Sequence, residues 1–285
     1  MFIKKSRILS VLLVLLVFCI FVLLLVPFNL HSMSSAKTQH TDQPLIIAHR
    51  GASGYAPENT LAAIDLAMKS DAQMIEIDVH LSKDGHIIVI HDKTVDRTTN
   101  GSGAIKEMTL DELQQLDAGS WFDEKFAGER LPTLQEVMSR INGEKKLLIE
   151  IKSGIKAYPG IDRKVAEAVL EADALDWCIV QSFDTPTLKQ INDQWPQITL
   201  HKLIVFKFRW LPLAFDGGIT SFSNKKYDFA EAINPHYRFV NRRFVRNRQN
   251  AGLKVNVWGG KAPDSYEKIR HIPVDGWITD FPNLH

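Results

Sequence analysis

The sequence predicts one α/β domain, a closed parallel (β/α)8 barrel of the TIM type, preceded by one N-terminal transmembrane helix. Short β-branched runs alternate with segments of helical periodicity along most of the chain. Residues 44–285 come close to the roughly 250 residues typical of one such barrel. Charged residues lie at or near the C-terminal ends of the first apolar runs, where a parallel barrel builds its active site.

The N-terminus has the pattern of a membrane anchor. Three basic residues precede an uncharged apolar run over residues 8–28, which as a helix would span roughly 30 Å. A cleaved signal peptide is the alternative, but its apolar region usually has only about 7–15 residues and ends in a small-residue cleavage site. We therefore expect residues 1–30 to form a cytoplasmic basic tip and a single-pass anchor, with the catalytic domain outside the cytoplasm.

The composition of the remaining chain is that of a globular domain. Residues 31–43 are polar, small and aperiodic, which predicts a linker before a barrel at 44–285. The net charge of +1 gives no basic field typical of nucleic-acid binding. Cys19 lies in the apolar run and Cys178 in a predicted strand, so the two cysteines predict neither a disulfide framework nor a zinc cluster.

The barrel elements follow in order. Eight apolar runs are the predicted strands: Leu45–Ala48, Met74–Leu81, Lys146–Ile151, Cys178–Phe183, Ile198–Val205, Ala230–Asn234, Leu253–Trp258 and Gly276–Asp280. The predicted helices are one that begins at Pro57–Thr60, then Thr133–Ile141, Arg163–Ala174, Thr185–Asp193, Val240–Ala251 and Asp264–Arg270. The alternation stops at about 93–131, which predicts an insertion after the second strand unit, on the active-site face.

Five side chains near these strand ends suggest phosphate chemistry. His49 and Arg50 follow the first strand, Glu76 and Asp78 share one face of the second, and His91 follows a further apolar run. Each histidine alone is more often structural. A buried face with two carboxylates is costly, however, unless a cation or hydrogen-bond donors compensate. The set predicts acid–base catalysis on a phosphate, assisted by a hard metal ion.

Six spaced motifs carry a resemblance to the glycerophosphodiester phosphodiesterase family. They are His49-Arg50-Gly51, Pro57-Glu58-Asn59-Thr60, Glu76-Ile77-Asp78, His91-Asp92, Asp96-Arg97-Thr98-Thr99 and Glu150-Ile151-Lys152. The resemblance runs from about Ile46 to Leu284 and implies a TIM-type barrel with an insertion. It also implies metal-dependent hydrolysis of glycerophosphodiesters to glycerol 3-phosphate and an alcohol, with Ca²⁺ or Mg²⁺ as the cation.

The resemblance also implies roles for individual residues. Matched motif by motif, the metal ligands are Glu76, Asp78 and Glu150, the acid–base pair is His49 and His91, and the phosphate-binding groups are Arg50 and Lys152. Three carboxylates make a hard oxygen site suited to Ca²⁺ or Mg²⁺. Gln181 and Trp258 lie at strand ends, from which they can contact the substrate.

Other polar residues near these motifs are expected to be mainly structural. Asp280 ends the last strand, and His201 is interpreted as a surface or packing residue. His80 either lines the cleft or packs. Glu58 either orients a catalytic histidine or stabilises the first turn of a helix, and Asp92, which follows His91, is interpreted as a cap of the insertion.

Two further features leave the substrate open. After Trp258 the family usually continues with Thr-Val-Asn, but this chain has Gly259-Gly260-Lys261, which suggests a changed pocket on the alcohol side. The stretch Phe206–Phe215 mixes aromatic and basic residues, and is either a packed loop or an interfacial loop that admits membrane lysolipids. The alternatives are therefore a lysophospholipase D-type hydrolysis of a lysolipid, or a non-catalytic lipid-binding barrel. The sequence leaves the oligomeric state undetermined.

Overall fold

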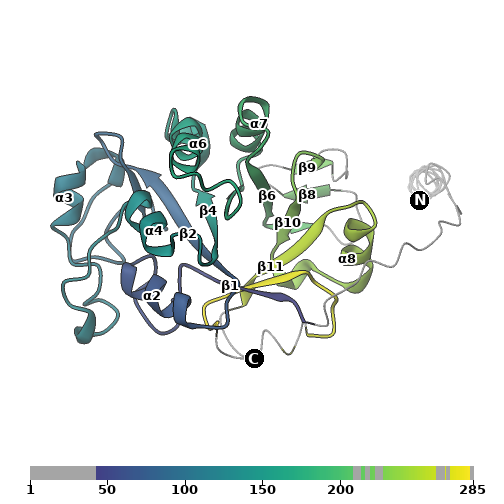
Figure 1. The fold of residues 1–285 in the computed structure, drawn as a ribbon, viewed down its shortest axis with the longest axis horizontal. Helices are drawn as coiled ribbons and strands as arrows, with labels where there is room; N and C mark the ends of the chain where they lie inside the picture. Colours follow the sequence, from purple (N-terminus) through teal and green to yellow (C-terminus); the bar gives the residue numbers. More distant parts are fainter. Residues whose placement is uncertain are drawn as a thin grey trace, which may run out of the picture. The chain divides into compact units, whose positions relative to one another are not determined.

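Eight parallel strands close into a barrel in the computed structural model of the protein, which describes residues 43–207, 213–215, 219–221, 227–260, 267 and 270–282 (Figure 1). The barrel strands are β1 (Leu45–Ala48), β2 (Met74–Leu81), β4 (Lys146–Ile151), β5 (Cys178–Ser182), β6 (Thr199–Ile204), β10 (Ala232–Pro235), β11 (Lys254–Gly260) and β12 (Gly276–Thr279). β1 pairs with both β12 and β2, which closes the sheet. The predicted TIM-type barrel is therefore confirmed.

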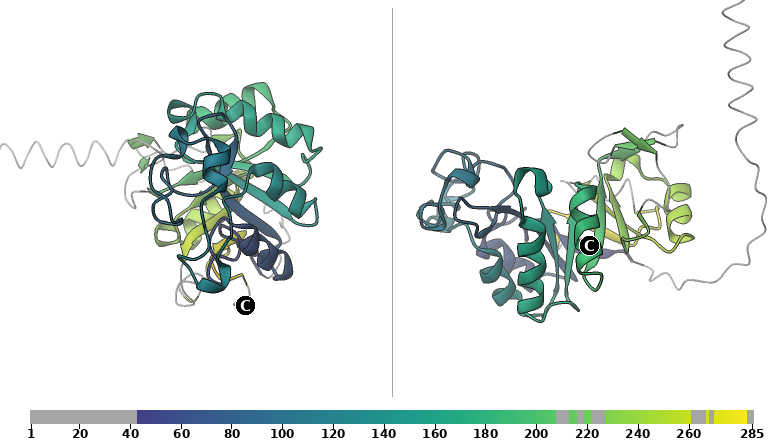
Figure 2. Two further views of the ribbon diagram at one scale, coloured as in Figure 1. Left: turned by 90° about the vertical axis from the view of Figure 1, so that its left-hand side faces the viewer. Right: turned by 90° about the horizontal axis from the view of Figure 1, so that it is seen from above.

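Helices that follow the strands pack on the outside of the barrel, as the views in Figures 1 and 2 show. They are α2 (Leu61–Lys69), α4 (Leu134–Ile141), α5 (Gly154–Ala157), α6 (Ile161–Glu171), α7 (Thr185–Gln194) and α8 (Arg242–Gln249). Side chains of Thr60, Thr133 and Asp184 cap the first turns of α2, α4 and α7 by accepting backbone N–H groups. These caps explain why each helix begins at its observed residue.

Several helix boundaries differ from the sequence prediction by one to three residues, and two of these differences have a clear local cause. α6 ends at Glu171, three residues before the predicted end, because Asp173 adopts a left-handed conformation with φ 49°. α8 begins at Arg242 because the Asn241 side chain accepts a hydrogen bond from the backbone N–H of Phe244 and caps the helix there. The predicted helix Asp264–Arg270 lies mostly outside the described residues.

The strand β3 (Ile87–Val89) is not part of the closed barrel. It pairs antiparallel with the last residues of β2, from Val79 to Leu81, so the chain returns along β2 toward the barrel mouth. His91 therefore reaches the site at the end of a returning hairpin. After this hairpin come η1 (Ile105–Glu107), α3 (Leu110–Gln114) and η2 (Glu124–Phe126), with a small apolar core of their own.

A second small sheet follows β6, in a region that the sequence treated as one loop. The strands β7 (Phe206–Lys207), β8 (Leu213–Phe215) and β9 (Ile219–Ser221) pair antiparallel. The side chains of the aromatic and basic stretch, predicted as either a packed loop or an interfacial loop, lie outside the described residues. The same holds for the predicted anchor at residues 8–28, and the described chain contains no helix long and apolar enough to cross a membrane.

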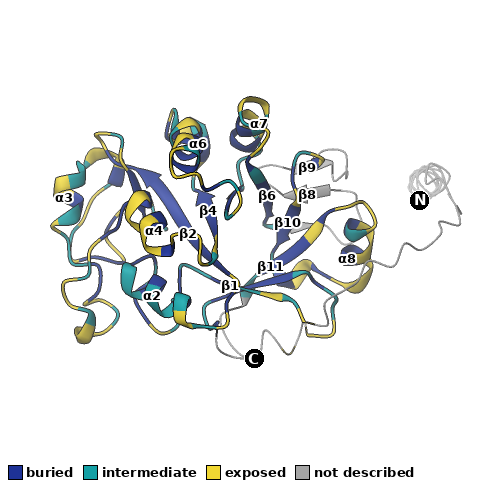
Figure 3. Ribbon diagram, viewed as in Figure 1, coloured by how far each residue is buried: buried dark blue, intermediate teal, exposed yellow. Residues whose placement is uncertain are grey.

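The core has an apolar layer outside the sheet and a mixed interior. Between strands and helices lies a large cluster of buried aliphatic side chains. Inside the barrel, one apolar layer is formed by Ile47, Met74, Leu148, Ile179 and Ile278. All eight residues of β2 are buried, as the dark blue of this strand in Figure 3 shows, so its charged residues are enclosed by protein.

Candidate active site

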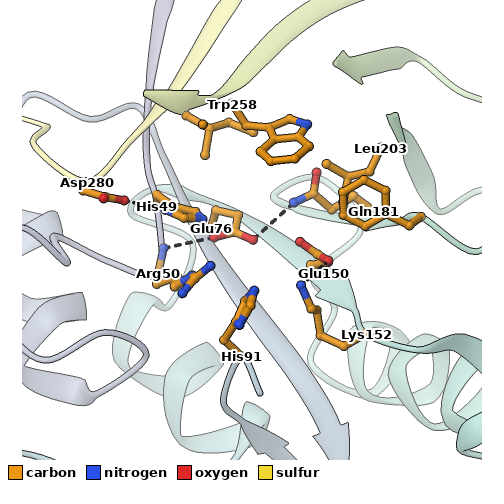
Figure 4. Close-up of a pocket in the computed structure, with 13 residues that line it drawn as sticks. His49, Arg50, Glu76, His91, Glu150, Lys152, Gln181, Leu203, Trp258 and Asp280 are labelled. Carbon is orange, nitrogen blue, oxygen red and sulfur yellow. Dashed lines mark hydrogen bonds and ion pairs between the residues drawn. The ribbon is translucent and has the colours of Figure 1, made fainter. Parts of the chain in front are cut away.

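A cavity of about 210 Å³ opens among the C-terminal ends of the barrel strands (Figure 4). Of the nine site residues predicted from the sequence, eight line it: His49, Arg50, Glu76, His91, Glu150, Lys152, Gln181 and Trp258. The ninth, Asp78, is fully buried beside them. The fold thus brings together residues that are up to about two hundred positions apart in the chain.

Three buried carboxylates form a cluster in this cavity. One oxygen each from Glu76, Asp78 and Glu150 lies within 4.8 Å of the others. Asp78 on β2 is in register with Glu150 on β4, and Glu76 lies one pleat before Asp78 on the same strand. Asp78 Oδ1 is buried and accepts no hydrogen bond. Three hard oxygen donors with an unsatisfied oxygen fit a divalent cation such as Ca²⁺ or Mg²⁺.

The carboxylates influence one another's protonation. Burial and the neighbouring Asp78 and Glu150 raise the pKa of Glu76 well above its usual value. Burial likewise raises the pKa of Glu150. Burial alone would raise the pKa of Asp78 as well, but the cations Lys152 and Arg50 lower it. Ionisation of all three carboxylates together is therefore unfavourable unless a further cation compensates their charge.

Arg50 and Lys152 supply positive charge at the rim of this cluster. The ammonium of Lys152 lies 2.7 Å from Glu150 Oε1, and Arg50 Nε lies 3.3 Å from Asp78 Oδ2. Arg50 has a left-handed backbone, with φ 54°, in a tight turn after β1. Gly51 completes this turn at φ 76°, where a Cβ would lie 2.7 Å from the backbone of Ala63. Only glycine fits there, which explains the His-Arg-Gly sequence.

Each of the two histidines is held by an aspartate. His49 Nδ1 lies 2.5 Å from Asp280 Oδ1, and His91 Nδ1 lies 2.6 Å from Asp92 Oδ1. An ionised carboxylate only accepts hydrogen bonds, so Nδ1 carries the proton and Nε2 is left for proton transfer. Burial lowers the pKa of His91, which keeps that ring neutral at physiological pH.

Asp280 is the first correction to the predicted site. From the sequence, Asp280 was predicted to be a structural residue, but barrel closure sets Thr279 in register with Ala48 and so brings Asp280 to His49. Burial would raise the pKa of Asp280, but the hydrogen bond from His49 and the charge of Arg50 outweigh it and lower this pKa. The signal in the sequence was an acidic residue at the C-terminal end of the strand next to β1.

A chain of ion pairs connects the phosphate side to His91, and the sequence analysis missed it. Glu58 accepts from Arg50 Nη1 at 2.7 Å and from both terminal nitrogens of Arg97, at 3.0 and 2.8 Å. Arg97 Nε then donates to Asp92 Oδ2 at 2.7 Å. Glu58 thus contacts neither histidine. We call Arg50–Glu58–Arg97–Asp92 the ion-pair chain.

His80 holds the backbone of His91 in place and is not among the residues that line the cavity. Its ring is fully buried, and its Nε2 donates to the backbone carbonyl of His91 at 3.0 Å. Burial lowers the pKa of His80 to about 4, so the ring stays neutral. The ring of Tyr158 packs edge-on against it, with centroids 5.2 Å apart. Of its two predicted roles, His80 therefore takes the packing one.

Polar side chains inside the barrel orient Glu76. Gln181 Nε2 donates to Glu76 Oε1 at 3.2 Å, and Asn234 Nδ2 donates to Gln181 Oε1 at 2.8 Å. Asn256 Nδ2 donates to Asn234 Oδ1 at 3.1 Å, and the ring of His201 lies 3.4 Å from Asn234. His201 is thus an interior residue of this network. Asn234 and Asn256 were not predicted, because an asparagine in a strand carries no motif by itself.

The aromatic side chains of Phe183 and Trp258 also line the cavity, and we call this pair the aromatic wall. The rings of Phe183 and Trp258 meet edge to face at 5.7 Å, and Trp258 Nε1 donates to the carbonyl of Asn234 at 2.9 Å. β11 has an irregular register between Val257 and Gly260, which turns the chain locally at Trp258. Gly259 has φ 97°, and a Cβ there would lie 2.4 Å from His236.

Comparisons with known proteins show the family to which the chain belongs. The model of the glycerophosphoryl diester phosphodiesterase family matches residues 49–284. A putative glycerophosphodiester phosphodiesterase of Bacillus subtilis, YhdW, is 42% identical over 241 residues, which cover 84% of this chain and 95% of that protein. A glycerophosphodiester phosphodiesterase of Caldanaerobacter subterraneus is 41% identical, covering 84% of this chain and 94% of that one.

Solved structures show the same fold. An Oleispira antarctica phosphodiesterase in complex with the product sn-glycerol-3-phosphate is 30% identical, with a TM-score of 0.72 over 84% of this chain and 94% of that one. The glycerophosphodiester phosphodiesterase of Agrobacterium tumefaciens is also 30% identical, with a TM-score of 0.70 over 85% of this chain and 98% of that one. On its sequence, its barrel and its site, the chain is an enzyme that belongs to the glycerophosphoryl diester phosphodiesterase family.

Proposed function

We propose that the barrel hydrolyses glycerophosphodiesters to glycerol 3-phosphate and an alcohol, with a hard divalent cation and with His49 and His91 as the acid–base pair. The observation that supports it most is the meeting of two aspartate-held histidines, three clustered carboxylates and two cations in one small cavity. The relatives' names and the product complex of the Oleispira antarctica enzyme point to the same substrate class.

Glu76, Asp78 and Glu150 are the residues that would hold the cation. When bound, Ca²⁺ or Mg²⁺ would polarise a phosphoryl oxygen and offset the charge that develops on the phosphate. Gln181 and Arg50 fix both oxygens of Glu76, since Gln181 Nε2 and the Arg50 backbone N–H donate to Oε1 and Oε2 respectively. The protein thus presets the direction in which Glu76 faces the cavity.

Arg50 and Lys152 are the proposed phosphate-binding groups. The planar guanidinium of Arg50 can donate to two phosphate oxygens at once, whereas Lys152 supplies a compact charge. Both side chains are mostly buried and fixed by carboxylates, so they lose little conformational entropy when the substrate binds. Gln181 and Trp258 would contact the organic part of the substrate, with the ring of Trp258 packing on it.

The two histidines would move the protons. With Nδ1–H donated to Asp280 or Asp92, each ring has Nε2 available for proton exchange. One ring, neutral and unprotonated on Nε2, takes the proton of the attacking water or glycerol hydroxyl group. The other ring, protonated on both nitrogens, gives its Nε2 proton to the leaving alkoxide oxygen. Each of the two transfers is expected to contribute about 10²–10⁴-fold in rate.

The comparisons do not favour the alternatives of lysophospholipase D-type hydrolysis or a non-catalytic lipid-binding barrel. A binding barrel would not need two histidines with paired aspartates beside a carboxylate cluster. We further propose that residues 1–30 anchor the enzyme in the membrane, that residues 31–43 link it to the barrel at 44–285, and that the barrel lies outside the cytoplasm. The apolar run at 8–28 supports this topology.

The reaction can be tested with the fragment 43–285. The barrel closes within this fragment, and the family model matches residues 49–284, so the fragment is expected to fold alone. Release of glycerol 3-phosphate from glycerophosphocholine is followed through a dehydrogenase, with EDTA and then with Ca²⁺ or Mg²⁺ restored. We expect metal-dependent release that is lost in Glu76→Ala and His91→Ala.

A matched control is His86→Ala, which removes an exposed histidine of the β2–β3 hairpin. This variant should retain full activity. Unchanged release in EDTA would contradict the proposed metal dependence, and an active His91→Ala variant would contradict the acid–base assignment. Release of choline alone, with no glycerol 3-phosphate, would favour the phospholipase D-type alternative.

A further inference from the structure

The segment from β10 to the end of α8 carries an unusual concentration of positive charge. Residues 236–250 contain five arginines and no acidic residue. The rest of the fragment 43–285 has the opposite balance, with 25 basic and 32 acidic side chains. One connected segment therefore opposes the net negative charge of the barrel around it.

Four of these arginines lie on the surface. They are Arg238, Arg242, Arg243 and Arg246, which we call the arginine face. The fifth, Arg248, packs inward with its guanidinium 5.6 Å from the ring of Phe244. Within the described part of the chain, none of the ion pairs involves a residue of the arginine face. Figure 3 shows exposed residues along the outer side of α8. These charges thus face solvent without acidic partners.

The arginine face begins beside the mouth of the active-site cavity. η4 (Tyr237–Phe239) directly follows β10, and the ring of His236 lies 4.7 Å from that of Trp258, which lines the cavity. The ring of Phe239 lies 5.8 Å from His236 and is 43% exposed. A large aromatic side chain therefore reaches solvent next to the arginines. Only His236 lies between it and Trp258, which lines the cavity.

We propose that the arginine face and Phe239 form a docking surface for a bilayer that contains anionic phospholipid. Arginines near such a surface gain electrostatic attraction, and an adjacent phenylalanine gains by entering the interfacial region. The remaining acidic barrel is repelled by the same membrane, so this face sets the orientation. A soluble polyanion would satisfy the arginines but offers no apolar phase for Phe239. That difference favours the bilayer.

This orientation would place the cavity mouth toward the lipid. His236 and Phe239, in the segment that follows β10, connect the docking surface to Trp258 of the aromatic wall on β11. The apolar run at 8–28 and the short linker after it would raise the local concentration of the barrel at a bilayer. The docking surface lies on the barrel itself and can therefore be tested without the N-terminal region.

The test is co-sedimentation of the fragment 43–285 with vesicles of phosphatidylcholine alone or mixed with phosphatidylglycerol. We expect binding to the mixed vesicles that weakens as NaCl increases. The double variant Arg243→Glu/Arg246→Glu should weaken this binding at least about 20-fold, since each arginine near an anionic surface contributes roughly fivefold. Its hydrolysis of soluble glycerophosphocholine should match that of the unchanged fragment, which reports correct folding.

The matched control is Lys106→Glu/Lys189→Glu, which changes the net charge equally at two exposed lysines elsewhere on the barrel. It should retain vesicle binding within about threefold. Phe239→Ser should weaken vesicle binding but leave binding to soluble polyphosphate unchanged. Equal binding to both vesicle types, or an equal loss in the lysine control, would overturn the docking surface. Strong polyphosphate binding without an effect of Phe239→Ser on vesicles would overturn the bilayer as its occupant.

Discussion

Arg97 donates two hydrogen bonds to Glu58, from Nη1 to Oε2 at 3.0 Å and from Nη2 to Oε1 at 2.8 Å. This fork joins two loops that are far apart in sequence. Glu58 lies after β1 and contacts Arg50, while Arg97 lies after β3 and contacts the Asp92 that holds His91. The pair therefore ties the position of a phosphate-binding group to that of an acid–base group.

Replacement of Arg97 by glutamine should lower kcat about 10- to 100-fold. The reason is that Asp92 and Glu58 lose their shared partner, and small displacements of His91 and Arg50 are costly in catalysis. The free energy of unfolding should change by about 1 kcal/mol or less, because the Arg97 side chain is 44% exposed. Steady-state kinetics and urea unfolding of the two proteins measure both effects.

Guanidinium rescue provides a specific control for this prediction. In Arg97→Ala, free guanidinium ions can enter the exposed space and restore the two forks, whereas ammonium ions of equal charge cannot. Arg130→Gln removes another exposed arginine of the same inserted region and should be neutral. Equal recovery with both ions would show that charge alone matters and that the geometry of the ion-pair chain does not.

Asp280→Asn should reduce kcat by about 10²-fold or more with little change in KM. An amide can donate to Nδ1 and would favour the neutral tautomer in which Nε2 carries the proton, so His49 could neither take a proton on Nε2 nor be stabilised as the imidazolium. Steady-state kinetics with glycerophosphocholine measure the changes in kcat and KM separately. The variant Asp275→Asn, which changes an acidic residue at the start of the same strand, serves as the comparison. Similar losses in both would point to a general weakening of β12.

The residues that sequence reasoning could predict are those whose chemistry is visible locally. The carboxylates of β2 were found because a charged face on an apolar strand is anomalous, and His49 and Arg50 because they end a strand. Asp280 was misjudged because its role depends on closure of the sheet between β12 and β1. Arg97 and Asn234 act through partners on other loops and strands, which spacing along one chain cannot reveal.

Some features of helices and strands were predicted wrongly or not at all, for reasons that are local to the chain. α8 begins two residues later than predicted because Asn241 caps it, and the antiparallel direction of β3 was not predicted because its apolar run carries no sign of its direction. The backbone conformation of individual residues could not be predicted from the sequence either. Nothing in the spacing shows that Gly259 adopts φ 97° against His236, although the Trp-Gly-Gly sequence marked the place.

A divalent cation should stabilise the folded fragment. Binding to the native state alone at one hundred times the dissociation constant adds about 2.7 kcal/mol, which corresponds to a rise in Tm of roughly 5–10 °C. Glu76→Gln should abolish this rise. Without cation it should be at least as stable as the unchanged protein at pH 7, because the raised pKa of Glu76 means that its buried charge opposes folding.

Thermal unfolding with EDTA, Ca²⁺ and Mg²⁺ measures these shifts independently of activity. Glu107→Gln, which neutralises an exposed carboxylate in η1, is the matched control and should retain the full shift. A shift that persists in Glu76→Gln would place the cation elsewhere than in the carboxylate cluster.

Gly259→Ala should raise KM more than it lowers kcat. The new Cβ would lie 2.4 Å from His236 Nε2 at a positive φ that alanine disfavours, so the loop and the adjacent Trp258 must shift. The carboxylate cluster and the histidines are on other strands and should stay in place. Gly252→Ala, which has φ 81° but open space around its Cβ, separates backbone strain from the clash. Equal KM values in the two variants would exclude the contact with His236 as the cause.

His201 should make the barrel sensitive to acid. Burial lowers its pKa to about 4 in the folded protein, despite the nearby Glu231, whereas the unfolded chain has the ordinary value of 6.5. Between pH 6.5 and 4 the unfolded state therefore binds more protons, and stability falls as the pH falls through this window. A difference of this size corresponds to about 3 kcal/mol of unfolding free energy. His201→Gln, which cannot take up the proton but can accept from Asn234, should flatten this part of the curve. Urea unfolding of both proteins from pH 4 to pH 7.5 tests the prediction. The difference in unfolding free energy between them should shift in favour of the variant as the pH falls, and parallel curves would mean that His201 does not titrate on unfolding.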